Sequence, residues 1–173
     1  MPKIVLITGG RKSGKSKFAE KIASEYSNLT YVALSESRPN DSDWQTRIKI
    51  HKSRRNINWK TIETEEIINV LNSEKNPLLI DSIGGFVTKG LSMNIKDWEL
   101  YKNRLLDSLS IYKNTIIIVG EQVGWGLVSE YKVGNLFADR LGEVLNALTK
   151  IADNNWITIN GKALRLDDIF IEI

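Results

Sequence analysis

The chain has 173 residues, 42% of them hydrophobic and 26% charged, which fits one globular domain with its own core. It contains no cysteine and one histidine, which excludes disulfide bonds, thiolate metal sites and sites built from several histidines. The net charge of +3 is mild, and any bound metal needs oxygen ligands, which favours Mg²⁺.

Short apolar runs alternate with amphipathic segments along the chain, a pattern that predicts strands and helices in turn. The predicted strands are Ile4–Ile7, Tyr31–Leu34, Trp59–Ile62, Leu78–Asp81, Thr115–Val119, Trp156–Ile159 and Ile169–Ile173. The predicted helices are Lys15–Tyr26, a segment from Ser42 or Asp43 to Arg55, one beginning at Thr64, Gly84–Leu91, one capped by Asp97 and ending near Tyr112, and Lys132–Ala152. This alternation predicts an α/β fold with a mostly parallel sheet and flanking helices, as a single domain over residues 1–173.

The beginning of the chain does not have the pattern of a signal peptide. Its apolar run, Ile4–Thr8, is short and leads directly into glycines. No stretch of eighteen apolar residues occurs, so we expect no membrane span. We therefore expect a cytoplasmic protein, and the absence of cysteine is compatible with that location.

A glycine-rich segment follows the first predicted strand and matches the phosphate-binding pattern G-x-x-x-x-G-K-[ST]. Its residues are Gly9, Gly10, Arg11, Lys12, Ser13, Gly14, Lys15 and Ser16. Glycines permit a tight turn whose backbone N–H groups point at phosphate oxygens, and the next helix presents its positive end to the same anion. Lys15 reaches the β- and γ-phosphates and the Ser16 hydroxyl ligates Mg²⁺. The segment predicts a site for a purine nucleoside triphosphate, with a plain strand-to-helix turn as the alternative.

An acidic residue, Asp81, ends the apolar run Leu78–Ile80. An aspartate at the end of a buried strand can hold the water shell of the Mg²⁺ ion that a P-loop enzyme requires. The alternative is a helix cap or a turn. Beside the glycine-rich segment we interpret Asp81 as a metal residue.

The single histidine lies in the predicted helix that ends at Arg55. Asp43, Arg47, His51 and Arg55 recur every four residues and so share one helix face, near Lys52 and Arg54. Guanidinium groups suit a triphosphate, and neighbouring positive charge keeps an imidazole neutral, as a nucleophile requires. A solvated charged face is the alternative, and we expect no nucleic-acid partner for this short basic stretch.

Taken together, these motifs resemble the bifunctional adenosylcobinamide kinase / adenosylcobinamide-phosphate guanylyltransferase family of cobalamin biosynthesis. The likeness runs in order from Ile4 to about Leu166. It is carried by Thr8–Ser16, Tyr31–Ala33, Asp43, Arg47, Ile48, His51, Arg55, Trp59–Thr61, Glu63, Leu78–Ser82, Thr88, Val123–Val128, Glu130, Phe137, Asp139 and Gly142.

The resemblance implies two reactions on a RecA-like P-loop core. The first phosphorylates the aminopropanol hydroxyl of adenosylcobinamide, and the second transfers GMP from GTP onto that phosphate through a guanylyl-histidine at His51. It implies ATP and GTP as substrates with Mg²⁺, a corrinoid as the small-molecule partner, and Arg47, Lys52, Arg55 and Glu63 in the nucleotide site. It also implies a homo-oligomer, with a trimer as the first candidate.

The chain departs from the family pattern at five positions. Glu121 and Gln122 stand where the family has Asn-Glu, Ser129 replaces a proline, and Asn135 and Ala138 replace two arginines. These departures leave two alternatives open, a P-loop small-molecule kinase without guanylyl transfer and a nucleotide-binding regulator that has lost catalysis. The phosphoryl donor, ATP or GTP, and the corrinoid taken also stay open.

Overall fold

A computed structural model describes residues 3–34, 56–126 and 128–169 of the chain. The strands are β1 (Ile4–Gly9), β2 (Thr30–Ala33), β3 (Lys60–Glu63), β4 (Leu78–Asp81), β5 (Ile116–Glu121), β6 (Asn154–Ile159) and β7 (Lys162–Arg165). The helices are α1 (Lys15–Ala23), α3 (Ile67–Ser73), α4 (Gly84–Gly90), α5 (Ile95–Ile111) and α6 (Lys132–Ile151).

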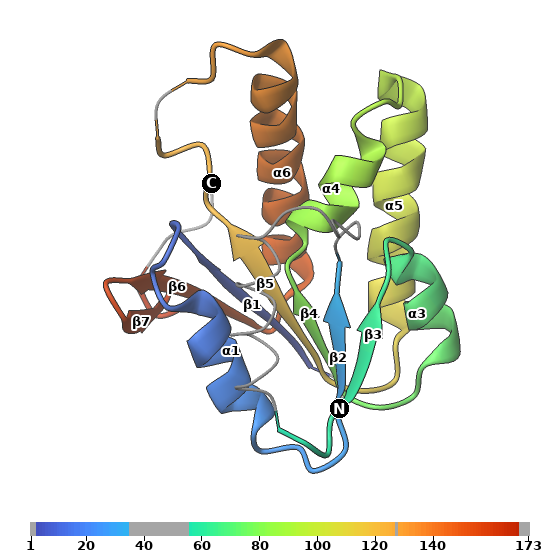
Figure 1. Cartoon of the computed structure of the whole chain (residues 1–173), viewed down its shortest axis with the longest axis vertical. Coiled ribbons are helices and arrows are strands. Elements are labelled where there is room, and N and C mark those ends of the chain that lie inside the picture. The colour runs from blue at the N-terminus through green and yellow to red at the C-terminus, as the bar shows by residue number, and fades with distance from the viewer. Residues whose placement is uncertain (1–2, 35–55, 127, 170–173) are drawn as a thin grey trace.

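The strands form one twisted sheet in the order β3-β2-β4-β5-β1-β6-β7 (Figure 1). All neighbours pair in parallel except β6 and β7, which are antiparallel. This arrangement confirms the predicted α/β fold with a mostly parallel sheet. Because β5 lies between β1 and β4, the P-loop strand and the strand that ends in Asp81 are separated by one strand.

Alternation along the strands divides the apolar residues between two cores. In β5, Ile116 and Ile118 join a core with side chains of α3, α4, α5 and α6, whereas Ile117 and Val119 face a core with Ala19 and Ala23 of α1. Successive side chains of a strand point to opposite faces, so a strand covered on both sides reads as a continuous apolar run. The continuous apolar runs of the central strands therefore allow these strands to be predicted from the sequence.

The α5 helix begins earlier than predicted, and Asp97 is not its cap. Asn94 occupies the N-cap position with extended backbone angles, and its side-chain oxygen accepts a hydrogen bond from the Asp97 N–H at 2.9 Å. The Asn94 amide in turn donates to the Asp97 carboxylate at 2.7 Å. Asparagine is as good a cap as aspartate, and the reciprocal pair places Asp97 in the first turn.

The strand predicted at 169–173 is not supported where it can be checked. Ile169 lies in a turn, and residues 170–173 lie outside the described part of the chain. The sheet instead gains β7, joined to β6 by Asn160 and Gly161, both with positive φ (50° and 77°). Asn-Gly is the preferred two-residue hairpin turn, a signal that the sequence contains and the prediction missed. The predicted helix ending at Arg55 lies outside the described residues.

None of the helices in the described ranges combines the length and the apolar character needed to cross a membrane.

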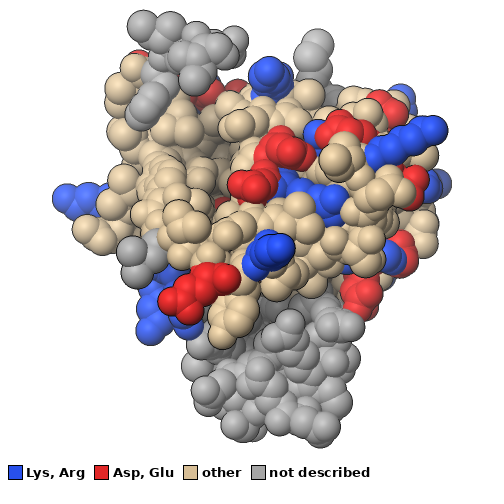
Figure 2. Space-filling view, turned by 90° about the horizontal axis from the view of Figure 1, so that it is seen from above, with Lys and Arg blue, Asp and Glu red and all other residues tan. Residues whose placement is uncertain are grey.

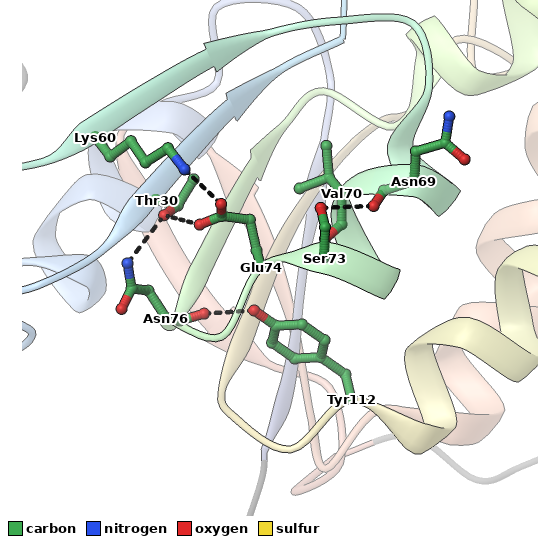
Figure 3. A network of polar contacts seen from close by, with 8 residues as sticks. All are labelled: Thr30, Lys60, Asn69, Val70, Ser73, Glu74, Asn76 and Tyr112. Atoms are coloured by element: carbon green, nitrogen blue, oxygen red, sulfur yellow. Dashed lines mark hydrogen bonds and ion pairs between the residues drawn. The ribbon is translucent and has the colours of Figure 1, made fainter.

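The amino ends of the central strands are held by a polar network around Glu74, just beyond α3 (Figure 3). Lys60 and the Thr30 hydroxyl both donate to its carboxylate, Thr30 at 2.9 Å. The Tyr112 hydroxyl donates to the Asn76 carbonyl at 2.6 Å, and burial, with the nearby Glu74 charge, raises the pKa of Tyr112 to about 12. A cavity of about 370 Å³ lies beside this network, lined by residues 71–75 and 111–114, at the sheet edge opposite the phosphate-binding loop.

We expect Glu74→Gln to lower the free energy of unfolding by about 0.5–1.5 kcal/mol at pH 7, a modest value because Lys60 is 55% exposed. The hydrogen bond from Lys60 holds the pKa of Glu74 below its ordinary value. A lowered carboxyl pKa stabilises the fold above the unfolded pKa, about 4.3, and that stability is lost as pH falls through the folded pKa.

The measurement is urea unfolding of wild type and variant from pH 7 to pH 3. The difference between them should be full at neutral pH and shrink below about pH 4.3. Glu25→Gln, at an exposed position beyond α1, is the matched control. A difference that stays constant over this range would show that packing, not charge, sets the effect.

Candidate active site

The glycine-rich segment forms a loop between the end of β1 and the start of α1. Gly14 caps α1 in the left-handed region (φ 107°), and Lys12 also has a positive φ of 58°. A side chain at Gly9 (φ 149°) would place its Cβ 2.4 Å from the Thr158 carbonyl oxygen. Both glycines are therefore required by backbone conformation, and at Gly9 also by space.

The loop is braced by the hairpin of β6 and β7. The Ser13 and Thr158 hydroxyls lie 2.7 Å apart, and Thr158 also contacts the Thr8 carbonyl at 3.3 Å. The Gly161 N–H donates to the Ser13 carbonyl at 2.9 Å. Thr158 is buried, so these bonds are shielded from water. The sequence analysis missed Thr158 and Gly161 because the contacts join segments almost 150 residues apart.

The Lys15 side chain is buried beside two carboxylates. Its ammonium donates to the Gly10 carbonyl at 2.7 Å, folded back over the loop. Burial lowers the pKa of Lys15 from its ordinary value, and the negative charges of Glu121 and Asp81 oppose that shift. The ammonium is thus held next to the space in which the loop's backbone N–H groups can receive phosphate.

The two predicted metal residues are brought together. The Ser16 hydroxyl donates to Asp81 Oδ1 at 3.2 Å, and the Tyr31 hydroxyl donates to Asp81 Oδ2. A hydroxyl and a carboxylate side by side are oxygen donors of the kind Mg²⁺ prefers. The described residues contain no cluster of three or more acidic or histidine side chains that could hold a metal alone.

A further carboxylate, Glu121, ends β5 directly opposite Gly9 in the sheet register. Its Oε1 accepts a hydrogen bond from the Ser82 hydroxyl, and its Oε2 is buried without a hydrogen-bond partner among the described residues. The sequence analysis noted Glu121 only as a departure from the family pattern. The sequence signal that could have identified Glu121 as a site residue is its position at the end of a buried apolar strand, like that of Asp81.

The other predicted site residues are placed less completely. Arg11 and Lys12 are exposed on the loop. Glu63 ends β3 at the same edge of the sheet, but four strand spacings, about 19 Å, separate β3 from β1. Its nucleotide-binding role stays a prediction. The predicted residues Arg47, His51, Lys52 and Arg55 lie outside the described residues, as does Asp43.

The departures at Ser129 and Asn135 are structurally coupled. The Ser129 N–H donates to the Asn135 side-chain oxygen at 3.0 Å, and the Asn135 amide donates back to the Ser129 carbonyl at 3.0 Å. A proline at 129 has no N–H and could not form the first bond. In this chain the segment before α6 is therefore stabilised by a pair of hydrogen bonds between Ser129 and Asn135, one of which a proline at 129 could not form.

The face at the carboxyl ends of the strands carries a mixed surface. Among the described residues in Figure 2, basic side chains lie beside acidic ones and are separated by uncharged surface. They form no continuous basic track on this face of the described chain.

The sheet order, the loop from β1 to α1 and the Ser16–Asp81 contact define a P-loop NTPase domain with a RecA-like sheet. Two solved structures support this fold at low sequence identity. A protein from Pyrococcus horikoshii OT3 has a TM-score of 0.54 at 9% identity, covering 95% of this chain and 85% of its own. An ATPase of a bacterial type III secretion system also has a TM-score of 0.54, at 12% identity, covering 90% and 50%.

The chain belongs to the cobinamide kinase / cobinamide phosphate guanyltransferase family, whose model matches residues 5–166. It is similar to the bifunctional adenosylcobalamin biosynthesis protein CobU of Escherichia coli K12, at 24% identity over 94% of this chain and 99% of the relative. It is similar to the corresponding CobP of Pseudomonas aeruginosa at 29% identity over 93% and 95%. The resemblance found in the sequence is confirmed.

We expect Asp81→Asn to raise the Mg²⁺ concentration needed for half-maximal phosphoryl transfer by at least about 10-fold, because a neutral amide is a weaker ligand for a hard cation. The measurement is a Mg²⁺ titration of the rate at saturating nucleotide. Asp139→Asn, an exposed aspartate on α6, is the control. An unchanged titration for Asp81→Asn would return Asp81 to a purely structural role.

We expect Thr158→Val to weaken nucleotide binding by about 5- to 10-fold, the effect of losing one buried hydrogen bond to the loop, about 1–1.5 kcal/mol. Valine keeps the shape but cannot bond to Ser13. Thr158→Ser retains the hydroxyl and should bind nucleotide nearly as well as wild type. Calorimetric titration with Mg-ATP measures the effect, and wild-type affinity in the valine variant would show that the contact does not position the loop.

Proposed function

We propose that the protein is a bifunctional enzyme that phosphorylates adenosylcobinamide and then transfers GMP from GTP onto the product. The observation that carries the proposal is a P-loop whose Ser16 hydroxyl meets Asp81, within a family match that covers residues 5–166. The relatives named as bifunctional adenosylcobalamin biosynthesis proteins match over almost their whole length.

In the first reaction the described residues act on the terminal phosphate. The backbone N–H groups of the loop and the buried Lys15 ammonium bind the β- and γ-phosphates and stabilise the charge that develops on them. Ser16 and Asp81 would hold Mg²⁺, and the ion would neutralise phosphate charge. The substrate hydroxyl attacks the γ-phosphorus, the bond from it to the β–γ bridging oxygen breaks, and the nucleoside diphosphate leaves.

In the second reaction the proposed nucleophile is His51. A ring nitrogen attacks the α-phosphorus of GTP and pyrophosphate leaves with the electron pair of the broken P–O bond. A phosphate oxygen of the cobinamide phosphate then attacks the same phosphorus and breaks the P–N bond, which regenerates the imidazole. The support is the four-residue spacing of Asp43, Arg47, His51 and Arg55, together with the family membership. Arg47, Lys52 and Arg55 would bind the triphosphate.

A catalytically inactive regulator is the weaker alternative. The glycine-rich loop, the buried Lys15 and the Ser16–Asp81 contact support an active site over one that has been lost. The Ser129–Asn135 exchange is accounted for by local hydrogen bonding, and nothing in the structure explains Ala138. Taken together, these observations favour an enzyme with an altered loop before α6 over a protein that has lost its site.

Further proposals rest on the family alone. We propose that ATP or GTP donates the phosphoryl group, that a corrinoid is the acceptor, and that the enzyme works in the cytoplasm. We also propose a homo-oligomer, with a trimer as the state to test by sedimentation equilibrium.

The decisive variant is His51→Ala. We expect it to abolish guanylyl transfer, by at least about 1,000-fold, because the covalent route is lost. Phosphorylation of adenosylcobinamide should stay within about 3-fold of wild type, because the γ-phosphate is bound by a different set of residues. GTP carrying isotope on its α-phosphate should leave an acid-labile label on the wild-type protein and none on the variant.

His51→Asn is the conservative control, which keeps polarity but lacks a nucleophilic ring nitrogen, and it should behave like the alanine variant. Native rates of GMP transfer by either variant would make His51 structural. Wild-type protein that phosphorylates the corrinoid but never takes up label would reduce the function to a kinase.

A further inference from the structure

One side chain next to the phosphate-binding loop has an unused hydrogen-bonding group. Glu121 Oε2 is buried and has no hydrogen-bond partner in the part of the chain that the structure describes, while Oε1 accepts from the Ser82 hydroxyl. The carboxylate is confined on one side by α4, where a Cβ added at Gly84 would lie 3.1 Å from Oε2. The fold thus restricts the position of the Glu121 carboxylate, and its Oε2 atom accepts no hydrogen bond from the described residues.

An unsatisfied buried acceptor is costly, typically about 1–3 kcal/mol. Such a group is retained in a site when a ligand supplies the missing donor. No donor within the described ranges does so, and the Lys15 ammonium bonds instead to the Gly10 carbonyl. Of the two carboxylates that raise the pKa of Lys15 against the effect of burial, Glu121 has the larger influence and Asp81 the smaller.

Its place in the sheet puts this acceptor next to the first residue of the phosphate-binding loop. Glu121 is in register with Gly9, the first residue of the loop, and the following N–H, of Gln122, donates to the Gly9 carbonyl at 2.9 Å. The neighbouring acid, Asp81, differs because it already accepts from the Ser16 and Tyr31 hydroxyls. The two carboxylates near Lys15 therefore differ in hydrogen bonding: both oxygens of Asp81 accept a hydrogen bond, whereas one oxygen of Glu121 accepts none from the described residues.

We propose that Glu121 is a catalytic residue of phosphoryl transfer, whose carboxylate accepts the hydrogen bond of the attacking hydroxyl and then its proton. The identity of that hydroxyl rests on the function proposed above. As the hydroxyl oxygen bonds to the γ-phosphorus, its proton passes to Glu121. The bond to the β–γ bridging oxygen breaks with its electron pair remaining on the leaving diphosphate, and Glu121 later releases the proton to water.

Glu121 is the last residue of β5, where pairing with β1 holds the backbone against the loop. The chain therefore has a carboxylate at this edge of the sheet, although the next residue, Gln122, is neutral.

The test is Glu121→Gln, which keeps the shape of the side chain and removes its capacity to accept a proton. Three quantities are compared with wild type: kcat for phosphorylation of adenosylcobinamide, the rate of ATP hydrolysis without acceptor, and the Kd for Mg-ATP by calorimetry. Water in the acceptor position presents the same O–H, so both rates should fall by about 100-fold or more. The Kd should change by less than about 3-fold, and Glu25→Gln, an exposed exchange of the same kind, should leave all three at wild-type values.

Each outcome decides the matter. Rates that stay at the wild-type level in the glutamine variant, or a weakened Kd with unchanged kcat, overturn the catalytic role. Wild-type protein that hydrolyses ATP in a Glu121-dependent manner but never phosphorylates the corrinoid supports the role of Glu121 and overturns the proposed function. Wild-type protein that binds Mg-ATP but turns over neither acceptor overturns both.

Discussion

The positions of the phosphate-binding loop and of Glu121 depend on the pairing of β1 with its two neighbours. β1 hydrogen-bonds in parallel to β5 on one side and to β6 on the other, so its last residue, Gly9, is fixed against both. From β5 comes Glu121, and from β6 comes Thr158, which bonds to Ser13 within the loop. A glycine-rich loop has little rigidity of its own, and this one is held by the strands on either side of β1.

The electrostatics follow from the same sheet order. Lys15 begins α1 on one face, and the carboxylates of Asp81 and Glu121 end the two strands next in line. Burial alone would favour a neutral amine, and the two negative charges oppose that effect. Phosphate binding brings further negative charge to Lys15, so the same burial that disfavours the free ammonium strengthens its interaction with the nucleotide.

The parts of the site that could be predicted are those in which chemistry and local sequence coincide. The P-loop is contiguous, and Asp81 follows a run of apolar residues that is recognisable as a buried strand, so both were found without a structure. Glu121 and Thr158 were not identified as site residues, because their roles come from strand order and register, which short-range patterns do not encode. A related limit explains why β7 (Lys162–Arg165) was not predicted. The strand is only four residues long and partly polar, so it shows no clear strand pattern, although the Asn160–Gly161 turn before it is a recognisable hairpin signal. The Asn94 cap was missed for a different reason: Asp97 has the same chemistry three residues later, and only the backbone angles distinguish them.

The two proposed reactions place different demands on one triphosphate. Attack by a substrate hydroxyl occurs at the γ-phosphorus, next to Lys15, Ser16 and the two strand-end carboxylates. Attack by a histidine occurs at the α-phosphorus, with pyrophosphate as the leaving group. In-line displacement at these two atoms requires nucleophiles that approach from different positions, since the leaving group must lie opposite the attacking atom. One rigid sheet edge can align only one of them. We infer that the carboxyl edge of β1, β4 and β5 serves the first reaction and that guanylyl transfer depends on groups contributed from outside that edge. The predicted helix face of Asp43, Arg47, His51 and Arg55 is the part of the sequence with the residue types proposed for that reaction.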